Sequence, residues 1–389
     1  MLLLHLSDLH LSRYGERGDW SQPDDEEGWE LVHQWQRWRI EGRRDRKGRP
    51  DKLRLLDPEG VVHQGRGWPG RKDEKIISRL LALAMERHMT SAEALVTNRP
   101  TPEDLHALLR LDPTNTNLRF LQVVDQLLPL GPELIAVTGD TTDNGFGYGL
   151  LEHYLRPWIE RQRLFVVPGN HDTYEMMPRR GRRARIQAKE EQYRDFTHRI
   201  GNAPNAAGAY VRRIGDIAVV GLNSCNALIG PLSAAGEVAR EQLVWLHELG
   251  RDPAFQQERL RLCLVHHHLL RMPFELGRRA PIEVGMRLRN AREVMQTCSE
   301  AGIDIMLNGH RHHGYMVQLP GHPMVVSSPS STLGCKSSDR RYVWLLDLAD
   351  RHPYPVMHVF SDDPALNDDD NGDPGTTPPP AASGDDPAA

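Results

Sequence analysis

The 389-residue sequence is poor in cysteine and has no long apolar run. Its four cysteines are widely spaced and form no Cys-x-x-Cys pair, which argues against a disulfide framework and favours a reducing compartment. No apolar stretch approaches the ~20 residues that cross a bilayer. The apolar start of the chain meets Asp8 and His10 too early for a signal peptide. We therefore expect a cytoplasmic protein without a membrane span.

The C-terminal segment 361–389 has no lysine or arginine. It carries eight aspartates, a proline run and several glycines and alanines. Such a segment cannot bury enough apolar surface to offset its ordering entropy, so we predict a disordered acidic tail. The 39% of hydrophobic residues is sufficient for one large domain over the remaining residues 1–360.

Short aliphatic runs of strand length recur along the chain. They cover 2–6, 134–137, 164–167, 260–265 and 303–307. Helical periodicity at 117–128 and 290–301 lies between such runs, and this alternation indicates an α/β core. Hairpin or meander patterns occupy 209–222, 315–326, 341–348 and 355–360. We predict two sheets that pack together and are flanked by helices.

Residues 13–116 fit neither pattern, and we interpret them as an insertion or cap near the mouth of the site. Helical periodicity is present at 74–89 and 102–111. Four tryptophans lie within 20–38, and 37–54 carries nine basic against three acidic residues. Packing within the insertion is the preferred interpretation of the tryptophans. The alternative is that they stack on nucleic-acid bases beside the basic segment.

Polar residues follow five of the predicted strands. In open α/β sheets, functional groups gather at the carboxyl ends of strands. The candidate metal ligands are Asp8, His10, Asp140, Asn170, His266, His310 and His312. Because Asp8 and His10 are two residues apart, their side chains point the same way in an extended chain, whereas His5 points to the other face and is expected in the core. Glycines before Asp140, Asn170 and His310 allow the sharp turns that aim these side chains into one site.

The donor types indicate the metal and the chemistry. Carboxylate, imidazole and amide oxygen without thiolate suit manganese, iron or zinc. A single zinc needs three or four ligands, so seven are enough for two ions that share one carboxylate. Two adjacent ions can hold an attacking hydroxide and neutralise charge on a phosphoryl group. His171 remains as a candidate proton donor to the leaving oxygen.

Taken in order, these motifs resemble the calcineurin-like metallophosphoesterase family. They are Asp8-x-His10, Gly139-Asp140-x-x-Asp143, Gly169-Asn170-His171-Asp172, His266 and Gly309-His310-x-His312. The resemblance extends over most of 1–12 and 117–348. The segments 219–223 and 241–246 further resemble the branch that contains class III cyclic-nucleotide phosphodiesterases and glycerophosphodiesterases.

The resemblance implies a four-layer αββα sandwich of two mixed sheets, here with a long, partly helical insertion after the first strand. It implies one metal bound by Asp8, His10, Asp140 and His312, and a second bound by Asp140, Asn170, His266 and His310. His171 would be the general acid, oriented by Asp172, and Asp143 would hold a ligand by hydrogen bonding. In this branch proline commonly follows the histidine pair, whereas leucines follow His266-His267-His268 here, so His267 stays an alternative to His266.

An arginine-rich run begins soon after Asp172. It contains Arg179, Arg180, Arg182, Arg183 and Arg185. A solvated helical face is the preferred interpretation, and the alternative is a phosphate-binding role for Arg179 and Arg182 together with His267. We predict a phosphodiesterase whose substrate is a cyclic or other small nucleotide. A nuclease acting on DNA or RNA and a catalytically silent scaffold on the same fold are the alternatives.

Overall fold

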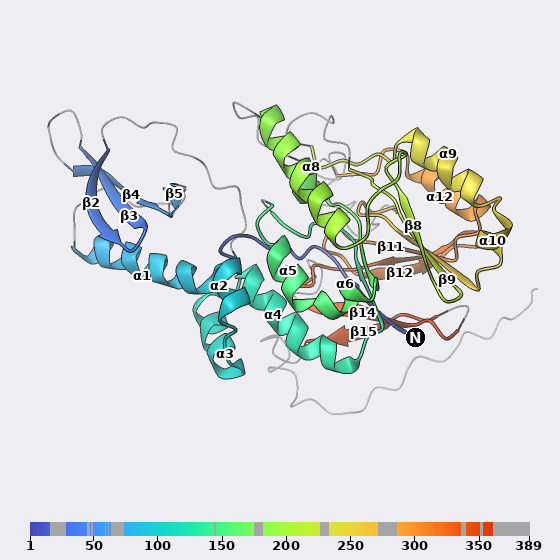
Figure 1. The fold of residues 1–389 in the computed structure, drawn as a ribbon, viewed down its shortest axis with the longest axis horizontal. Coiled ribbons are helices and arrows are strands. Elements are labelled where there is room, and N and C mark those ends of the chain that lie inside the picture. Colours follow the sequence, from blue (N-terminus) through green and yellow to red (C-terminus); the bar gives the residue numbers. More distant parts are fainter. Residues whose placement is uncertain are drawn as a thin grey trace, which may run out of the picture.

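Two mixed β-sheets pack face to face in the computed structural model (Figure 1). The structure describes residues 1–15, 29–44, 47, 50–58, 60, 62–63, 74–143, 145–174, 182–225, 233–270, 286–335, 340–350 and 353–360. The predicted acidic tail 361–389 lies outside these residues.

The first sheet has the strand order β15-β14-β1-β6-β7. Its members are β1 (Leu2–Leu6), β6 (Leu134–Val137), β7 (Leu164–Val166), β14 (Tyr342–Asp347) and β15 (Val356–Val359). Strands β1, β6 and β7 are parallel, and β14 joins β1 antiparallel. The three parallel strands therefore end at the same edge of the sheet.

The second sheet has the order β12-β13-β11-β10-β9-β8. Its members are β8 (Tyr210–Ile214), β9 (Ile217–Gly221), β10 (Leu260–Leu264), β11 (Ile305–Asn308), β12 (Tyr315–Gln318) and β13 (Met324–Ser327). The four central strands are parallel, and the edge strands β8 and β12 form the predicted hairpins. This sheet too has one edge at which its parallel strands end.

Alternation along each strand divides the core into layers. Leu3, Leu262 and Leu307 point between the sheets, while their neighbours Leu4 and Met306 point outward to the helices. Helices α4 (Thr116–Leu127) and α5 (Tyr148–Tyr154) cover the first sheet, and α9 (Arg240–Leu249) and α12 (Ala291–Glu300) cover the second. The predicted four-layer αββα sandwich is therefore confirmed.

Shorter elements connect these layers. They are the 3-10 turn η1 (Leu128–Leu130), α6 (Arg156–Glu160), α7 (Asn170–Thr173), the long α8 (Arg182–Arg199) and α10 (Pro253–Gln256). Among the described helices, none combines the length and apolar character that crossing a bilayer requires. All four cysteines are described, and none forms a disulfide.

The region 13–116 contains a small sheet that the sequence did not predict. Strands β2 (Trp29–Trp35), β3 (Trp38–Arg44), β4 (Pro50–Leu56) and β5 (Val62–His63) pair antiparallel, and α1 (Glu74–Thr90) packs against them. Figure 1 shows this sheet set off from the two main sheets. The apolar alternation that reveals a strand is interrupted here, because the pairing of β2 shifts between Leu31 and His33 and β3 ends in Gly42-Arg43-Arg44.

The remaining helices of this region belong to the main core. Helices α2 (Ala92–Thr97) and α3 (Pro102–Leu111) bury Leu95, Leu105 and Leu109 in the cluster that also holds α4 and α5. The predicted helices at 74–89 and 102–111 are thus both present, but they serve two different cores.

The described tryptophans of the small sheet are engaged in packing. Trp38 is 1% exposed. The Arg54 guanidinium lies 4.2 Å from the Trp29 ring centroid, and the Trp35 ring meets His88 edge-on at 5.7 Å. These contacts favour the packing interpretation over base stacking, while Trp20 lies outside the described residues.

Removing a large side chain between the two main sheets should destabilise the fold. Phe165 on β7 is fully buried there. We expect Phe165→Ala to lower the free energy of unfolding by about 3–5 kcal/mol, because it leaves a cavity in a close-packed layer. Chemical denaturation measures the change. Val244→Ala, at a 49% exposed position of α9, is the control and should change it by less than about 0.5 kcal/mol. Equal midpoints for both variants would contradict the packing described here.

Candidate metal centre

The seven predicted ligands converge where the parallel strands of both sheets end. Asp8 and His10 follow β1, Asp140 follows β6 and Asn170 follows β7. On the other sheet, His266 follows β10, and His310 and His312 follow β11. None of the seven residues is more than 4% exposed. So many buried polar groups require partners, either one another or a bound ion.

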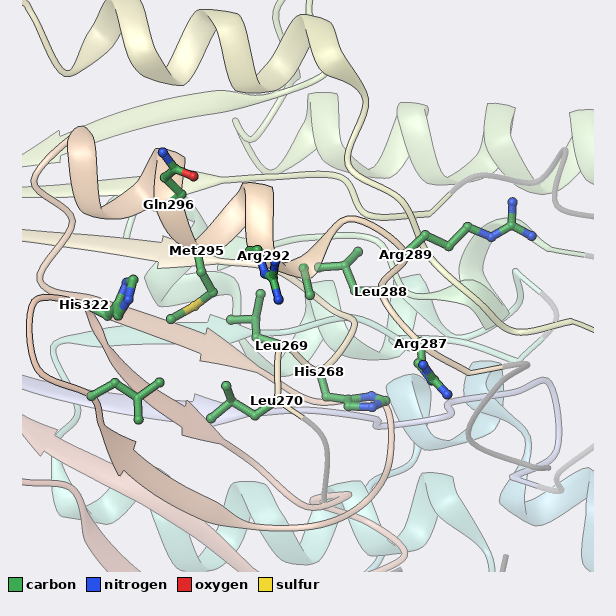
Figure 2. Close-up of a pocket in the computed structure, with 12 residues that line it drawn as sticks. His268, Leu269, Leu270, Arg287, Leu288, Arg289, Arg292, Met295, Gln296 and His322 are labelled. Carbon is green, nitrogen blue, oxygen red and sulfur yellow. The ribbon is translucent and has the colours of Figure 1, made fainter. Parts of the chain in front are cut away.

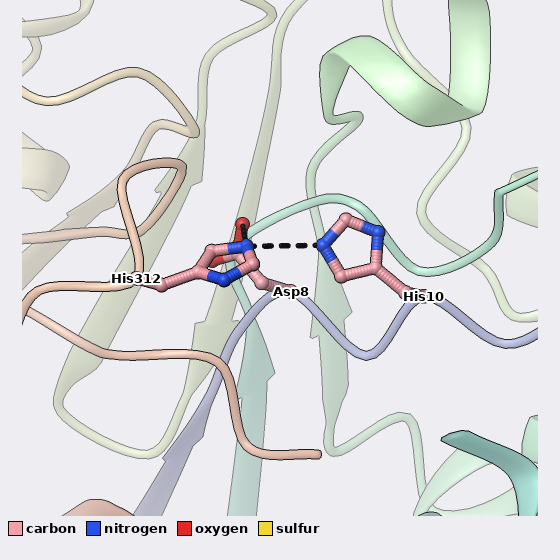
Figure 3. A group of neighbouring side chains, drawn as sticks. All are labelled: Asp8, His10 and His312. Carbon is pink, nitrogen blue, oxygen red and sulfur yellow. Dashed lines mark hydrogen bonds and ion pairs between the residues drawn. The ribbon is translucent and has the colours of Figure 1, made fainter. Parts of the chain in front are cut away.

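Asp8, His10 and His312 form the first cluster (Figure 3). The Nε2 atoms of His10 and His312 lie 3.1 Å apart, and Asp8 Oδ1 lies 3.4 Å from His312 Nε2. Asp8 Oδ1 is buried and accepts no hydrogen bond from the described residues. Neighbouring donors around one ion with bonds of about 2.0–2.2 Å lie ~3–3.4 Å apart, so these three atoms fit a shared cation.

Asn170, His266 and His310 form the second cluster. Asn170 Oδ1 lies 3.1 Å from His266 Nε2 and 2.9 Å from His310 Nδ1, and these two nitrogens are 3.1 Å apart. The other nitrogen of each ring contacts a carbonyl, Thr138 O at 2.8 Å and Met286 O at 3.0 Å, and therefore carries the proton.

The three inward atoms of this second cluster are thus all acceptors. Burial, assisted by His267, holds the pKa of His310 well below its ordinary value, so the ring is neutral and its inward nitrogen carries a lone pair. With no proton to share, the three acceptors repel one another unless a cation lies among them. The donor chemistry fits a metal ion here as well.

Asp140 lies between the two clusters. Its Oδ2 is 4.0 Å from His10 Nε2 and 3.5 Å from His266 Nε2. The other oxygen, Oδ1, accepts a hydrogen bond of 2.8 Å from the backbone N–H of His171, which fixes the orientation of the carboxylate. One oxygen therefore faces both groups of donors, as a shared ligand must.

The backbone at the ligands is strained. Seven described residues other than glycine have positive φ, and five of them are ligand candidates. These five are Asp8, His10, Asp140, His310 and His312, with φ between 49° and 79°. Each such conformation costs on the order of 1–3 kcal/mol, so the surrounding structure holds the ligands against a local preference to relax.

Two of the predicted turn glycines are needed for close approach rather than for a positive φ. A Cβ at Gly169 would collide with the backbone nitrogen and carboxylate of Asp140. A Cβ at Gly309 would collide with Ser7 Oγ and lie 2.5 Å from Asp8 Oδ2. A side chain at either position would push the loops of the site apart.

Asp143 contacts two imidazoles. Its Oδ1 lies 2.6 Å from His10 Nδ1 and 2.9 Å from His171 Nδ1. The His171 side chain is 28% exposed, unlike the buried ligands. Burial lowers the pKa of His171, but the carboxylates of Asp140 and Asp143 outweigh burial and raise the pKa to about 9. Asp143 therefore contacts both the candidate ligand His10 and the candidate proton donor His171.

The prediction that Asp172 orients His171 is wrong, because Asp143 occupies that role. The Asp172 carboxylate instead accepts hydrogen bonds from the backbone N–H groups of Thr141, Thr142 and Gly169 at 2.9–3.1 Å, and from the Tyr148 hydroxyl at 3.0 Å. It ties the loop after β6 to the loop after β7. The resemblance implied a contact with His171, whereas the Asp172 carboxylate is engaged by these backbone groups and by Tyr148.

Lys189 is a supporting residue that sequence reasoning missed. It lies in α8, is 9% exposed, and its Nζ donates to the carbonyl oxygens of Asp143, His171 and Tyr174 at 3.0–3.3 Å. The bonds connect the two loops that carry the proton donor and its partner. A single lysine in a strongly charged helix gives no signal in the sequence.

The three candidate substrate-binding residues lie in different surroundings. Both ring nitrogens of His267 are bonded within the protein, to Ser224 Oγ at 2.8 Å and Ala234 O at 3.0 Å, so His266 and not His267 faces the cluster. Arg182 begins α8 and is half-buried. Arg179 lies outside the described part of the chain. A role for these arginines in phosphate binding stays a prediction.

Comparison with known proteins gives one family match. The family described as calcineurin-like phosphoesterase matches residues 104–314, more than half of the chain. A search of curated proteins found no match. Because the structural likenesses below have TM-scores under 0.5, the assignment depends on the family match.

Three similar solved structures have low sequence identity to this chain. A dimetal phosphatase from Danio rerio is 13% identical, with 64% of this chain and 90% of that chain covered and a TM-score of 0.41. A purple acid phosphatase from yellow lupin (Lupinus luteus) seeds is 10% identical, with 84% and 57% covered and a TM-score of 0.41. A metallophosphoesterase from Sphaerobacter thermophilus is 13% identical, with 62% and 83% covered and a TM-score of 0.30.

Neutralising the shared carboxylate should release metal. We expect Asp140→Asn to hold at most one ion where the unaltered protein holds about two, because an amide oxygen is a weaker donor than a carboxylate between two cations. Elemental analysis of the gel-filtered protein gives the stoichiometry. Asp216→Asn, at an exposed carboxylate, should keep the full content. Two ions retained by Asp140→Asn would show that Asp140 is not shared.

Proposed function

The chain belongs to the calcineurin-like phosphoesterase family, and we propose that it hydrolyses phosphodiesters at a dinuclear metal centre. The family implies a metal-dependent hydrolase of phosphoesters. The observation that carries the finer proposal is the pair of donor clusters on either side of Asp140. Each cluster offers the number and type of donors that one cation needs.

Bound manganese, iron or zinc would supply Lewis acidity, neutralising charge on the phosphoryl group and lowering the pKa of an attacking water. The chain's own contribution is to hold the imidazole donors in fixed orientations. Asp143 fixes the tautomer of His10, and the carbonyls of Thr138 and Met286 fix those of His266 and His310. Burial excludes competing water from the donors.

His171 is the proton donor in this proposal. Its Nδ1 is held by Asp143, so Nε2 is the nitrogen that would donate to the leaving oxygen. Lys189 fixes the backbone on both sides of this pair. His171 is also the exposed imidazole beside the first cluster, with its ring 4.8 Å from that of His10.

We favour a cyclic or other small nucleotide as the substrate. The two segments that resemble the cyclic-nucleotide branch are joined in space, since the Gln242 side chain bonds both the N–H and the carbonyl of Asn223 at 2.8 Å. Asn223 follows β9, at the edge where the parallel strands of the second sheet end. The branch resemblance therefore corresponds to one structural unit on the side of the site.

Metal removal tests the reaction class. We expect chelated protein to lose nearly all turnover of bis(4-nitrophenyl) phosphate, and Mn²⁺ to restore it, because no protein group replaces the Lewis acid. Cyclic nucleotides, phosphomonoesters and oligonucleotides assayed with the restored protein then rank the substrates. Preference for oligonucleotides with strong salt dependence would identify a nuclease instead. If the protein binds no metal even after Mn²⁺ is added, and hydrolyses none of these esters, it is a scaffold on the same fold.

Loss of the proton donor should depend on the leaving group. We expect His171→Ala to keep both ions and to lose about 10²–10⁴ of the rate on an ester with an alkoxide leaving group. The loss should be much smaller with 4-nitrophenolate, which departs without a proton. Steady-state kinetics on the two esters measures the difference, and His198→Ala near the end of α8 is the control. An equal loss on both esters would contradict the assignment of His171.

A further inference from the structure

A cavity of about 810 Å³ lies near the second donor cluster. Figure 2 shows the residues that line it. It lies between the turn after β10, the segment before α12 and α12 itself. Part of its wall is apolar, from Leu269, Leu270, Leu288, Met295 and Leu319. A cavity of this size accommodates a small organic molecule.

The polar residues of the cavity are almost all basic. They include Arg287, Arg289, Arg292, His268 and His322, and the described lining contains no aspartate or glutamate. The lining includes three arginines and, among its described residues, no carboxylate, which favours a positive potential at the cavity. An anion is the ligand that such a potential favours.

Two buried nitrogens in this wall have no hydrogen-bond partner within the described structure. They are His268 Nδ1, in a side chain that is 4% exposed, and Arg287 Nε. Figure 2 shows the two side chains next to each other. A buried polar group left unsatisfied costs about 1–3 kcal/mol, and more if it is charged. The cost falls when an oxyanion accepts hydrogen bonds there.

The cavity shares a wall with the metal centre. The carbonyl of Met286 accepts the outer N–H of the ligand His310, and Arg287 is the next residue. The His268 ring stacks on His310 with centroids 5.9 Å apart. The N–H of Gly236 donates to the carbonyl of Arg287 at 2.9 Å, and the carbonyl of Gly236 accepts from the N–H of Arg289 at 2.8 Å. These two bonds hold the segment in place. A substrate bound at the donor clusters would therefore lie close to the cavity.

We propose that this cavity is a second substrate subsite. It binds an oxyanion, either a phosphate or a carboxylate, that is attached to an apolar part of the substrate. The scissile phosphoryl group of the same substrate lies at the donor clusters. The inference rests on the proposed function for the identity of the scissile group. Of the small nucleotides favoured above, this subsite selects phosphodiesters that carry a further negative charge, rather than a simple cyclic monophosphate whose only charge is on the scissile group. Arg287 and His268 supply donors, and the leucines and Met295 contact the apolar part.

Three chromogenic esters test the subsite. Thymidine 5′-(4-nitrophenyl phosphate) is compared with the same ester bearing a 3′-phosphate or a 3′-O-succinyl group. We expect kcat/KM to be about tenfold higher for at least one of the anionic esters, and the better one identifies the preferred oxyanion. Arg287→Met should bring this ratio close to one, and Arg292→Met, a substitution on the exposed side of α12, should reduce it. Arg251→Met, at an exposed arginine outside the cavity, should leave the ratio as it was.

Binding of thymidine 3′,5′-bisphosphate, measured by calorimetry on the same proteins, separates the two claims. We expect Arg287→Met to weaken binding about tenfold relative to Arg251→Met. If no ester is hydrolysed yet binding depends on Arg287, the subsite stands and the phosphodiesterase proposal fails. If the esters are hydrolysed with equal kcat/KM, and neither arginine variant in the cavity alters binding, the subsite is overturned.

Discussion

Mutual repulsion among buried acceptor atoms is the constraint on which this structure depends. Around Asp140, carboxylate oxygens, an amide oxygen and imidazole lone pairs point at one another. Their outer sides are already bonded, so no rotation of the rings supplies the missing protons. Such an arrangement is stable only with cations among the donors or with a scaffold rigid enough to resist the repulsion. The fold provides the rigidity.

The rigidity comes from two sheets acting together. The first sheet supplies Asp8, His10, Asp140 and Asn170, and the second supplies His266, His310 and His312. Hydroxyl groups after β13 hold the strained turn after β1, since Ser330 Oγ donates to Asp8 O at 2.6 Å and Thr332 Oγ1 donates to Leu9 O at 2.9 Å. Positive φ angles at five ligands persist because these bonds and the packed layers beneath them oppose relaxation.

Residues that contact the candidate ligands connect the donor clusters to the proposed chemistry. Asp143 is shared by a ligand and the proposed proton donor, so the position of one imidazole constrains the other. At the second cluster, the Met286 carbonyl contacts His310, and the next residue, Arg287, lines the basic cavity. In the described structure, Arg287 Nε and His268 Nδ1 have no hydrogen-bond partner, so they can donate to an anion. In this proposal the acceptor-rich clusters hold cations and the neighbouring cavity binds an anion. A phosphodiester with a second negative charge complements both.

Much of this protein was accessible from its sequence, because short aliphatic runs and the polar residues after them are local signals. They predicted the core strands, the main helices and the residues that converge, and the resemblance carried by the ordered motifs implied the αββα layers. What remained hidden depends on contacts between distant segments. Asp143 rather than Asp172 contacts His171, and Lys189 bonds two loops together. Helices α2 and α3, which the sequence placed in the insertion, pack in the main core. The small sheet β2–β5 was also missed, because a register shift in β2 and the Gly-Arg-Arg end of β3 interrupt its apolar alternation. Spacing along a chain determines which face of an element a side chain occupies, but only the packing of elements decides which distant group it meets.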